Sequence, residues 1–328
     1  MGMLIEGVWE PDDSAARVGS RGEFVRMQTT FRNTISEERD AVYFPEANRY
    51  HLYVSNACPW SHRTAITVVI KGLDDVISLS SVAPQVGTNG WTFAEFADGD
   101  HDPIYGADHL HQIYSAVQAD YTGRVTVPVL FDKKTRTIVN NESTEIMRML
   151  NSAFNSMARY PEIDLYPREL REDIDSVNNL IYSTVNNGVY RTGFAITQEQ
   201  YEEAVIGLFH TLDLLERRLA GNRYLCGDRL TEADWRLFPT LIRFDLVYYS
   251  HFKCNARRLV DYPNLLGYVR ELYQFRGIAS TVNVEHIKNH YYRSHTTINP
   301  TGIVPVGPDF SLFDRPHERQ SLKRSSGA

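Results

Sequence analysis

The sequence predicts an α/β domain followed by an all-α domain. Between residues 50 and 155, short β-rich runs alternate with runs at helical spacing, whereas from Pro167 onward apolar residues recur at helical spacing alone. At 328 residues the chain is long enough for two domains, each with its own core. We expect an N-terminal extension, an α/β domain, a helical domain and a C-terminal tail over residues 1–49, 50–160, 161–297 and 298–328.

The α/β part has a recognisable order of elements. A strand, a helix and a second strand come first, an insertion follows over residues 84–108, and a second helix, a hairpin and a third helix complete the set. We place these elements at His51–Ser55, Trp60–Lys71, Val76–Val82, Asp108–Gln118, Val129–Phe131 with Thr137–Val139, and Ser143–Ala153. The order βαβαββα is that of a thioredoxin-like domain, and we expect the insertion to be a long polar loop.

Residue patterns typical of helix starts mark where individual helices begin in the helical part of the chain. Thr197–Gln200 has the spacing of a capping box and is followed by an apolar stripe, and Thr231–Asp234 has the same spacing. Pro263 suits the first position of another helix, which Gly277 would end. Residues 1–49 and the tail after Ile298 show no periodicity, so we expect both to be irregular and the last dozen residues to be mobile.

Cys58 is the strongest candidate for chemistry. It lies between the first strand and the first helix, with Pro59 directly after it. At the mouth of a helix, the exposed N–H groups and the helix dipole favour a thiolate over a thiol. Ser61 stands where a dithiol motif has its second cysteine, so a mixed disulfide formed on Cys58 has to be resolved by an external thiol.

The Val127–Pro128 pair precedes the hairpin. A proline in a strand cannot donate to the ladder and is found at sheet edges. In thioredoxin-like domains the proline at this place is cis and faces the helix-start cysteine, and the residue before it offers its backbone to a thiol peptide. Because Cys58 starts a helix about 70 residues upstream, we favour the cis interpretation over an edge-strand proline.

Four further residues are candidates for binding a ligand. Glu142 and Ser143 stand at a helix start, where a hydroxyl and N–H groups receive a carboxylate and a glutamate pairs with an ammonium group, as the γ-glutamyl end of glutathione requires. A plain N-cap is the alternative for Ser143. Trp91, within the insertion, is either a plug over the core or a lid over a ligand. Arg124 is either a carboxylate ligand or an ordinary surface residue.

Three of the 19 tyrosines lie in distinctive contexts, namely Tyr190, Tyr248 and Tyr291. Their phenols can donate a proton to a leaving group or hydrogen-bond a thiolate, although packing is the commoner role of a tyrosine. Cys226 and Cys254 are expected to be structural. The histidines, His62 among them, show no metal-ligand spacing, so we expect no metal site.

The overall composition narrows the class of protein. The net charge of -7 argues against nucleic acid or an anionic membrane as the main partner. No apolar run approaches the roughly 20 residues that span a bilayer. Three widely spaced cysteines make no disulfide framework, so we expect a cytoplasmic protein in a reducing compartment.

Together these motifs resemble the glutathione transferase superfamily, and most closely its xi class, the glutathionyl-hydroquinone reductases. The resemblance runs from about Gly2 to Pro308 and rests on Cys58–Ser61, Asn89–Phe93, Gly123–Pro128, Asn141–Ser143, Asn186–Tyr190, His251–Cys254 and His290–Gly302. One residue departs from the family pattern, because Ser61 stands where the class usually has alanine. A serine there is able to adjust the Cys58 thiolate by a hydrogen bond.

The resemblance implies a reaction and a set of roles. Cys58 would attack the sulfur of a glutathionyl-hydroquinone and a second glutathione would release glutathione disulfide. Tyr190 would transfer the proton, and Tyr248 and Tyr291 would hydrogen-bond the Cys58 thiolate. The residues implied to hold glutathione are Trp91, Arg124, Val125, Thr126, Val127, Glu142 and Ser143.

The resemblance also implies a homodimer formed through the helical domain, with glutathione as co-substrate and no bound cofactor. Two alternatives stay open on the sequence. One is a general glutathione-dependent thiol transferase or dehydroascorbate reductase of the omega type, which would use the same cysteine. The other is a non-catalytic module of the same fold, which would need no nucleophile.

Overall fold

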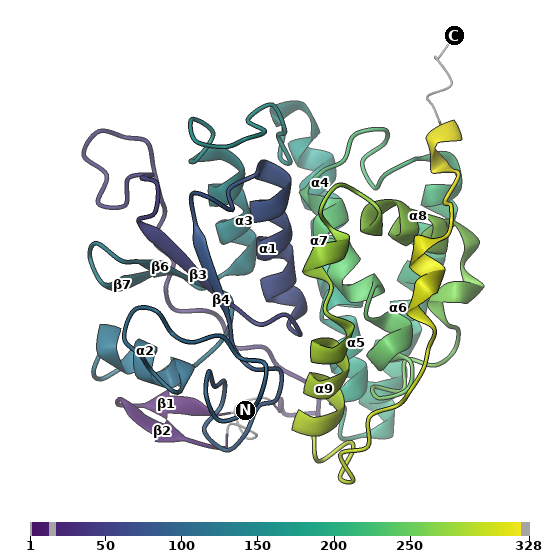
Figure 1. Cartoon of the computed structure of the whole chain (residues 1–328). Helices are drawn as coiled ribbons and strands as arrows, with labels where there is room; N and C mark the ends of the chain where they lie inside the picture. Colours follow the sequence, from purple (N-terminus) through teal and green to yellow (C-terminus); the bar gives the residue numbers. More distant parts are fainter. Residues whose placement is uncertain (1, 13–17, 323–328) are drawn as a thin grey trace. The chain divides into compact units, whose positions relative to one another are not determined.

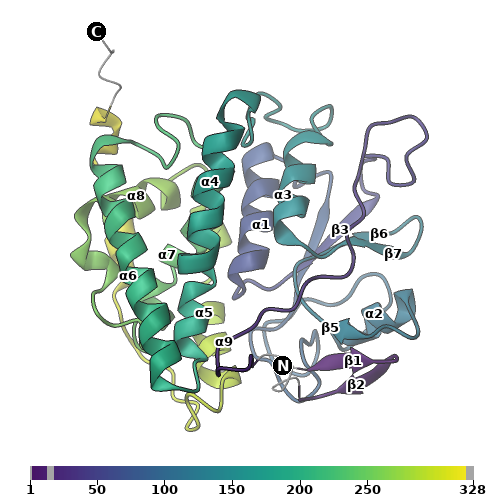
Figure 2. The ribbon, with the colours of Figure 1, turned by 180° about the vertical axis from the view of Figure 1, so that it is seen from behind.

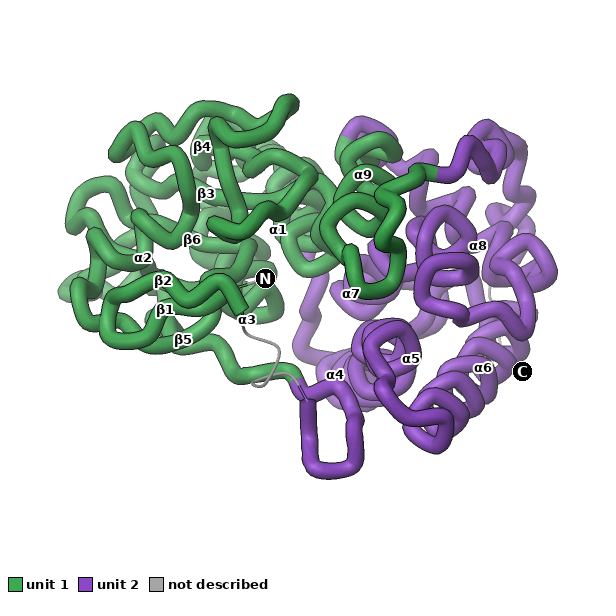
Figure 3. The backbone as a smooth tube through the Cα atoms, turned by 90° about the horizontal axis from the view of Figure 1, so that it is seen from below, with its two compact units in different colours: residues 1–17, 26–163, 281–304 green, residues 18–25, 164–280, 305–328 purple. Residues whose placement is uncertain are grey.

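The computed structural model describes residues 2–12 and 18–322, and these residues form two compact units (Figure 3). The first unit contains residues 2–12, 26–163 and 281–304, and the second contains residues 18–25, 164–280 and 305–322. Each unit is therefore built from segments that lie far apart in the sequence. In the described part of the chain, no helix is both long and apolar enough to cross a membrane.

A four-stranded sheet forms the centre of the first unit (Figure 1). Its order is β4-β3-β6-β7, with β3 and β4 parallel and the other neighbours antiparallel. The parallel pair needs a crossover, which α1 provides. The bounds are β3 Tyr50–Val54, α1 Pro59–Lys71, β4 Ser78–Ser81, α2 Leu110–Val117, β6 Val129–Asp132, β7 Thr137–Asn140 and α3 Ser143–Ser152. The predicted order βαβαββα is confirmed.

The alternation of side chains along the strands produces one core on each face of this sheet. In β6, Val129 and Phe131 contribute to the core that includes α2, whereas Leu130 contributes to the core beneath α1 and α3. In β3 the same alternation places Tyr53 on the α2 side and Leu52 on the other. These side chains are fully buried in both cores. Cys58 belongs to the core on the α2 side.

The N-terminal extension was predicted to lack regular elements, and this is wrong. Residues Met3–Ile5 form β1 and Val8–Glu10 form β2, and both belong to an antiparallel sheet completed by β5, Gly123–Arg124 (Figure 2). The tight turn between β1 and β2 uses positive φ angles at Glu6 and Gly7. Strands of two or three residues are too short to show periodicity in the sequence.

A later part of the extension continues the central sheet. The N–H of Asn33 donates to the carbonyl of Val139 at 3.0 Å, and the N–H of Asn141 donates to the carbonyl of Phe31 at 3.1 Å. Arg32 forms an antiparallel bridge with Asn140 at the end of β7 and an ion pair with Glu145. The extension therefore runs along the outer edge of β7, up to the start of α3.

The insertion over residues 84–108 is a long loop, as predicted, and Asp102 organises it. The carboxylate of Asp102 is fully buried and accepts a hydrogen bond from the Tyr53 hydroxyl at 2.6 Å and from the N–H groups of Ile104, Tyr105 and Ala107. Burial alone raises the pKa of the Asp102 carboxyl, but these hydrogen bonds outweigh it and leave the pKa below its usual value. The hydrogen bond between Tyr53 and the Asp102 carboxylate thus fixes this loop to β3.

The second unit is helical, with α4 Arg171–Ile181, α5 Gly188–Gly193, α6 Gln198–Gly221, α7 Glu232–Leu241 and α8 Pro263–Tyr273. Two π-helical turns, Tyr182–Asn186 and Phe244–Tyr248, interrupt the α-helices, and single 3₁₀ turns lie at Arg168–Leu170 and Leu259–Asp261. Pro263 takes the first position of α8 as predicted. The helix ends at Tyr273 and not at Gly277, which lies four residues beyond.

The two predicted capping boxes differ. At the start of α7 the box is complete, and the carboxylate of Asp234 accepts from the N–H of Thr231 at 2.8 Å. At the start of α6 the Thr197 hydroxyl accepts from the N–H of Gln200 at 3.4 Å, but the reciprocal bond is missing. The side-chain amide of Gln200 is buried and makes no hydrogen bond with any described residue. This half of the prediction is wrong.

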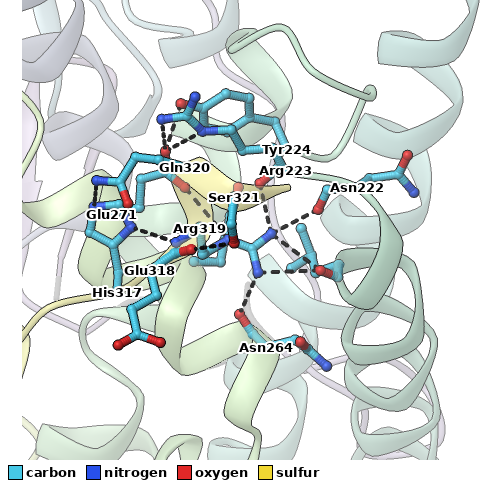
Figure 4. Close-up of polar contacts among 12 residues, drawn as sticks. Asn222, Arg223, Tyr224, Asn264, Glu271, His317, Glu318, Arg319, Gln320 and Ser321 are labelled. Carbon is cyan, nitrogen blue, oxygen red and sulfur yellow. Dashed lines mark hydrogen bonds and ion pairs between the residues drawn. The ribbon is translucent and has the colours of Figure 1, made fainter. Parts of the chain in front are cut away.

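The C-terminal tail was expected to be irregular and its last dozen residues mobile, and Arg319 contradicts this. Its guanidinium is buried and donates to the backbone carbonyls of Leu219, Asn222 and Arg223 (Figure 4). Two 3₁₀ turns, Phe310–Asp314 and Arg319–Ser321, lie in this tail. A single charged residue thus fixes the tail to the end of α6, and residues 323–328 lie outside the described part.

Candidate active site

Cys58 occupies the predicted place at the mouth of α1. It is the N-cap residue, its carbonyl accepts the first helical hydrogen bond from the N–H of His62 at 2.9 Å, and Pro59 begins the helix. Its side chain is 8% exposed, and its thiol lies 3.8 Å from the carbonyl oxygen of Val127. The Cys58 thiol makes no capping hydrogen bond to the N–H groups at the start of α1, and its hydrogen bond goes to the Val127 carbonyl.

The Val127–Pro128 peptide bond is cis, as predicted. Val127 is buried at 6% exposure and precedes β6, which begins at Val129. The Val127 carbonyl is the partner of the Cys58 thiol. The structure thus brings together two residues that are 69 positions apart in the chain.

Glu142 and Ser143 lie at the start of α3, and Ser143 is not the residue that caps this helix. The N-cap is Glu142, whose Oε1 accepts from the N–H of Thr144 at 3.2 Å, and Ser143 is the first helical residue. A plain N-cap role for Ser143 is therefore wrong. The other carboxylate oxygen of Glu142 accepts from the hydroxyl of Thr29 at 3.4 Å, so the extension reaches this helix start.

Trp91 is packed as a plug. It is 5% exposed, belongs to the same core as Cys58 and stacks on the His290 ring with 5.0 Å between centroids and 16° between planes. The Nδ1 of His290 lies 2.9 Å from the carbonyl of Pro84 and fixes the ring. His290 is in α9, Val284–Ser294, which belongs to the first unit. Of the two interpretations of Trp91, the packing favours the plug.

Tyr291 follows His290 in α9 and is therefore in the unit that contains Cys58. It is 1% exposed, and its ring lies edge-on to His290 and His295, at 5.2 and 5.4 Å between centroids. The Oγ of Ser294 in the same helix accepts from the N–H of Val86 at 2.9 Å. Helix α9 is thus held against the insertion at two points.

Tyr190 and Tyr248 lie in the second unit and are neighbours there, with 6.0 Å between ring centroids. Tyr190 is in α5, which follows the first π-helical turn, and Tyr248 ends the second. Such turns are frequent at functional sites. Both rings contact Phe252, and we use the term aromatic cluster for Phe24, Tyr190, Phe194, Tyr248 and Phe252.

The segment Arg124–Val127 is held in place by two tyrosines that the sequence did not single out. The hydroxyl of Tyr121 donates to the carbonyl of Arg124 at 3.2 Å, and the hydroxyl of Tyr114 donates to the carbonyl of Thr126 at 2.9 Å. Val125 is buried. The Thr126 hydroxyl is buried and makes no hydrogen bond with any described residue.

Comparisons with known proteins decide the family. The family described as "Glutathione S-transferase, N-terminal domain" matches residues 57–153, and "Glutathione S-transferase, C-terminal domain" matches residues 198–271. The chain is 53% identical to glutathionyl-hydroquinone reductase PcpF from Sphingobium chlorophenolicum over 94% of this chain and 96% of that protein.

Two solved structures agree with this. The xi glutathione S-transferase from Phanerochaete chrysosporium has a TM-score of 0.86 at 53% identity, over 89% of this chain and 94% of that one. This chain belongs to the xi class of glutathione transferases. The glutathione-bound structure of YqjG from Escherichia coli K-12 has a TM-score of 0.87 at 49% identity, over 97% of this chain and 99% of that one. The predicted fold, a thioredoxin-like domain with an all-α domain, is thereby confirmed.

In this xi-class transferase the other two cysteines have different surroundings from Cys58. Cys254 is fully buried, with its sulfur 3.9 and 4.0 Å from the carbonyls of Phe252 and Val189, and burial raises its pKa well above the ordinary value. Burial also raises the pKa of Cys226 to about 11. Both therefore stay protonated near neutral pH, as expected of structural cysteines. Within the described residues, no group of three or more His, Cys, Asp or Glu side chains is arranged to hold a metal ion.

Ser61 and His62 lie about one helical turn beyond Cys58 in α1. The Ser61 hydroxyl is fully buried and makes no hydrogen bond with any described residue, so the expected adjustment of the thiolate by Ser61 is not made in this structure. The Nε2 of His62 lies 2.8 Å from the hydroxyl of Thr281. His62 thus joins α1 to the segment that leads into α9, within the first unit.

Proposed function

We propose that Cys58 is the nucleophile of a glutathionyl-hydroquinone reductase. The chain is a glutathione-dependent enzyme of that family, which its 53% identity to a named reductase over 94% of its length establishes. The observation that carries the role of Cys58 is its place at the start of α1, with its sulfur 3.8 Å from the carbonyl of the cis-bonded Val127. Cys226 and Cys254 have their pKa values raised by burial and do not compete for this role.

In the first half-reaction, the Cys58 thiolate attacks the sulfur of the glutathionyl-hydroquinone. A bond forms between the two sulfurs and the bond from sulfur to the ring carbon breaks. The electron pair of that bond stays with the ring, which takes up one proton and leaves as the hydroquinone. Cys58 is then in a mixed disulfide with glutathione.

In the second half-reaction, the thiolate of a second glutathione attacks the glutathione sulfur of this mixed disulfide. Glutathione disulfide leaves and the Cys58 thiolate is regenerated. The two electrons that reduce the ring therefore come from two glutathione thiols, one of which entered as part of the substrate. No bound cofactor is needed for this balance.

Glutathione would be held by polar groups of the first unit. Glu142 suits the ammonium group of the γ-glutamyl end, and the hydroxyl and N–H of Ser143 at the start of α3 suit its carboxylate. The cis-bonded Val127 offers its backbone to the cysteinyl part beside Cys58. Arg124, Val125 and Thr126 would contact the rest of the tripeptide, and the resemblance to the class assigns Trp91 to the same role.

The proton for the ring carbon would come from Tyr190, and Tyr248 and Tyr291 would hydrogen-bond the Cys58 thiolate, as the resemblance to the class implies. The aromatic cluster supports this assignment, because it keeps Tyr190 among the apolar rings that a quinone-derived substrate suits. We further propose a homodimer formed through the helical domain and a cytoplasmic location, where glutathione is abundant and thiols stay reduced.

The substrate assignment is tested by steady-state turnover on three acceptors, with glutathione in excess. We expect kcat/KM on a glutathionyl-hydroquinone to exceed that on a glutathione mixed disulfide and on dehydroascorbate by at least about 100-fold, which corresponds to roughly 3 kcal/mol of transition-state discrimination. A preference for either of the other acceptors would identify an omega-type thiol transferase or dehydroascorbate reductase and would overturn the assignment.

A further inference from the structure

Tyr114 lies at the centre of a hydrogen-bond network in the first unit. It is in α2 and is fully buried, and its hydroxyl donates to the carbonyl of Thr126 at 2.9 Å. The same oxygen accepts from the N–H of Thr126 at 3.4 Å and from the side-chain amide of Asn141 at 3.1 Å. A phenol has one donor and two acceptor positions, so all of them are used within the protein.

The two partners of Tyr114 belong to different segments of the proposed glutathione site. Thr126 precedes Val127, whose carbonyl contacts the Cys58 thiol. Asn141 precedes Glu142, the N-cap of α3. The strands β6 and β7 separate these two segments in the chain, so the Tyr114 hydroxyl is a direct bridge between them.

Asn141 extends the network to the N-terminal extension. Its side-chain oxygen accepts from the N–H of Phe31 at 3.2 Å, and its own N–H donates to the carbonyl of Phe31 at 3.1 Å. The Phe31 ring lies edge-on to the Tyr114 ring at 5.8 Å between centroids. Both side-chain groups of Asn141 are therefore committed, one to the extension and one to Tyr114.

We propose that Tyr114 is a positioning residue for glutathione, which holds the Val127 backbone and the start of α3 at the separation that the tripeptide requires. Tyr114 does not contact glutathione in this account, because its oxygen has no hydrogen-bonding position left. It acts through Thr126 and Asn141. The proposal rests on the proposed function, since those two segments are the ones assigned to glutathione.

The chemistry of the phenol suits this role. Burial raises the pKa of Tyr114 to about 12, so the hydroxyl keeps its proton over the whole working range and always donates to Thr126. A phenylalanine at 114 would fill the same space but would leave the Thr126 carbonyl and the Asn141 amide without this partner. The two segments would then be free to move apart while the fold is kept.

The direct test measures glutathione binding by calorimetry in a Cys58→Ser background, where no turnover takes place. Adding Tyr114→Phe is expected to weaken glutathione binding about fivefold to tenfold, the effect of losing roughly one net hydrogen bond. In the chain that keeps Cys58, the same substitution is expected to raise KM for glutathione and for the glutathionyl-hydroquinone while kcat changes less than about twofold.

Tyr50→Phe is the matched control. Tyr50 is also fully buried and its hydroxyl donates to a backbone carbonyl, that of Phe44 at 2.7 Å, but it belongs to the core on the other face of the sheet. Both substitutions are expected to lower the denaturant midpoint, and only Tyr114→Phe is expected to weaken glutathione binding. Equal binding by the two variants would overturn the proposal.

Asn141→Ala provides a second variant that tests the bridge itself. If Tyr114 acts through Asn141, the losses in glutathione affinity from Tyr114→Phe and Asn141→Ala are less than additive in the double variant. Additive losses would contradict the bridge. A failure of the proposed function would be recognised separately, because glutathione would bind while the chain with Cys58 failed to reduce a glutathionyl-hydroquinone.

Discussion

The surroundings of Cys58 and Cys254 differ although the residue type is the same. In the first unit, Cys58 caps α1, keeps 8% exposure and has its thiol 3.8 Å from one carbonyl. In the second unit, Cys254 has no exposure, lies near two carbonyls and has its pKa raised by burial. Carbonyl oxygens and burial favour the thiol, whereas helix N–H groups favour the thiolate. We therefore expect Cys58, and not Cys254, to act as the nucleophile.

The largest expected effect is on turnover. Cys58→Ser is predicted to reduce kcat/KM on a glutathionyl-hydroquinone by at least about 1000-fold, because an alkoxide is not available near neutral pH to replace the nucleophilic thiolate. Coupled reduction of glutathione disulfide gives the rate. Cys254→Ala is the control and should keep its rate within about twofold of the unmodified chain, since its sulfur takes no part in the reaction. Equal losses in both variants would remove the distinction between the two cysteines.

A smaller effect is expected on the rates at which iodoacetamide alkylates Cys58 and Cys226. Cys226 has its pKa raised from 9.0 to about 11, so at pH 8 its thiolate fraction is about 100-fold lower than that of an ordinary thiol. Peptide mapping after iodoacetamide treatment should show modification of Cys58 long before Cys226. The rate at Cys226 should still be rising between pH 9 and 10. A rate at Cys226 that is already flat below pH 9 would contradict the effect of burial.

The raised pKa of Cys226 also affects the stability of the fold at high pH. Between pH 9.0 and about 11, the unfolded chain has lost the Cys226 proton while the folded chain keeps it. The unfolded state then binds fewer protons, so the free energy of unfolding falls as pH rises through this range. Urea unfolding at a series of pH values, compared with a Cys226→Ala variant, isolates the contribution. An identical pH dependence in the two proteins would show that Cys226 does not contribute.

Cys254→Ala is expected to affect stability and leave chemistry unchanged. Removing a fully buried sulfur leaves a small cavity, and a loss of about 1 kcal/mol in the free energy of unfolding is expected. A denaturant titration measures it. No loss of stability would mean that the packing around Val189 and Phe252 does not depend on this side chain.

The smallest effect is expected for Ser61→Ala. The Ser61 hydroxyl is buried without a hydrogen bond to any described residue, so its removal should stabilise the fold by up to about 1 kcal/mol. The rate on a glutathionyl-hydroquinone should change less than about twofold, because the hydroxyl does not reach the Cys58 sulfur. A large fall in rate on this substitution would show that Ser61 does adjust the thiolate.

Sequence patterns identified the parts of the fold that depend on local backbone chemistry. The places of Cys58 and Pro128 could be predicted because a helix start and a proline directly before a strand each restrict the backbone in a way that the sequence shows. Strands β1 and β2 could not, because three residues give no periodicity. Gln200 has the right residue type for its capping box, but its side chain is buried and makes no return bond.

The residues that sequence reasoning missed act over long distances in the chain. Tyr114 meets Thr126 and Asn141, and Arg319 meets carbonyls about 100 residues earlier. Neither contact leaves a local signal, since one is a tyrosine in an amphipathic helix and the other an arginine in an irregular tail. The roles assigned to Tyr190, Tyr248 and Tyr291 stay predictions, because the ring contacts describe their packing and not their chemistry.

Peptide mass spectrometry tests the proposed role of Cys58 most directly. The protein is mixed with one equivalent of a glutathionyl-hydroquinone in the absence of free glutathione, quenched with acid and digested without reductant. We predict one glutathione adduct on the Cys58 peptide, formed together with one equivalent of hydroquinone, and no adduct in Cys58→Ser. An adduct on Cys226 or Cys254, or hydroquinone released with no adduct on Cys58, would contradict the account.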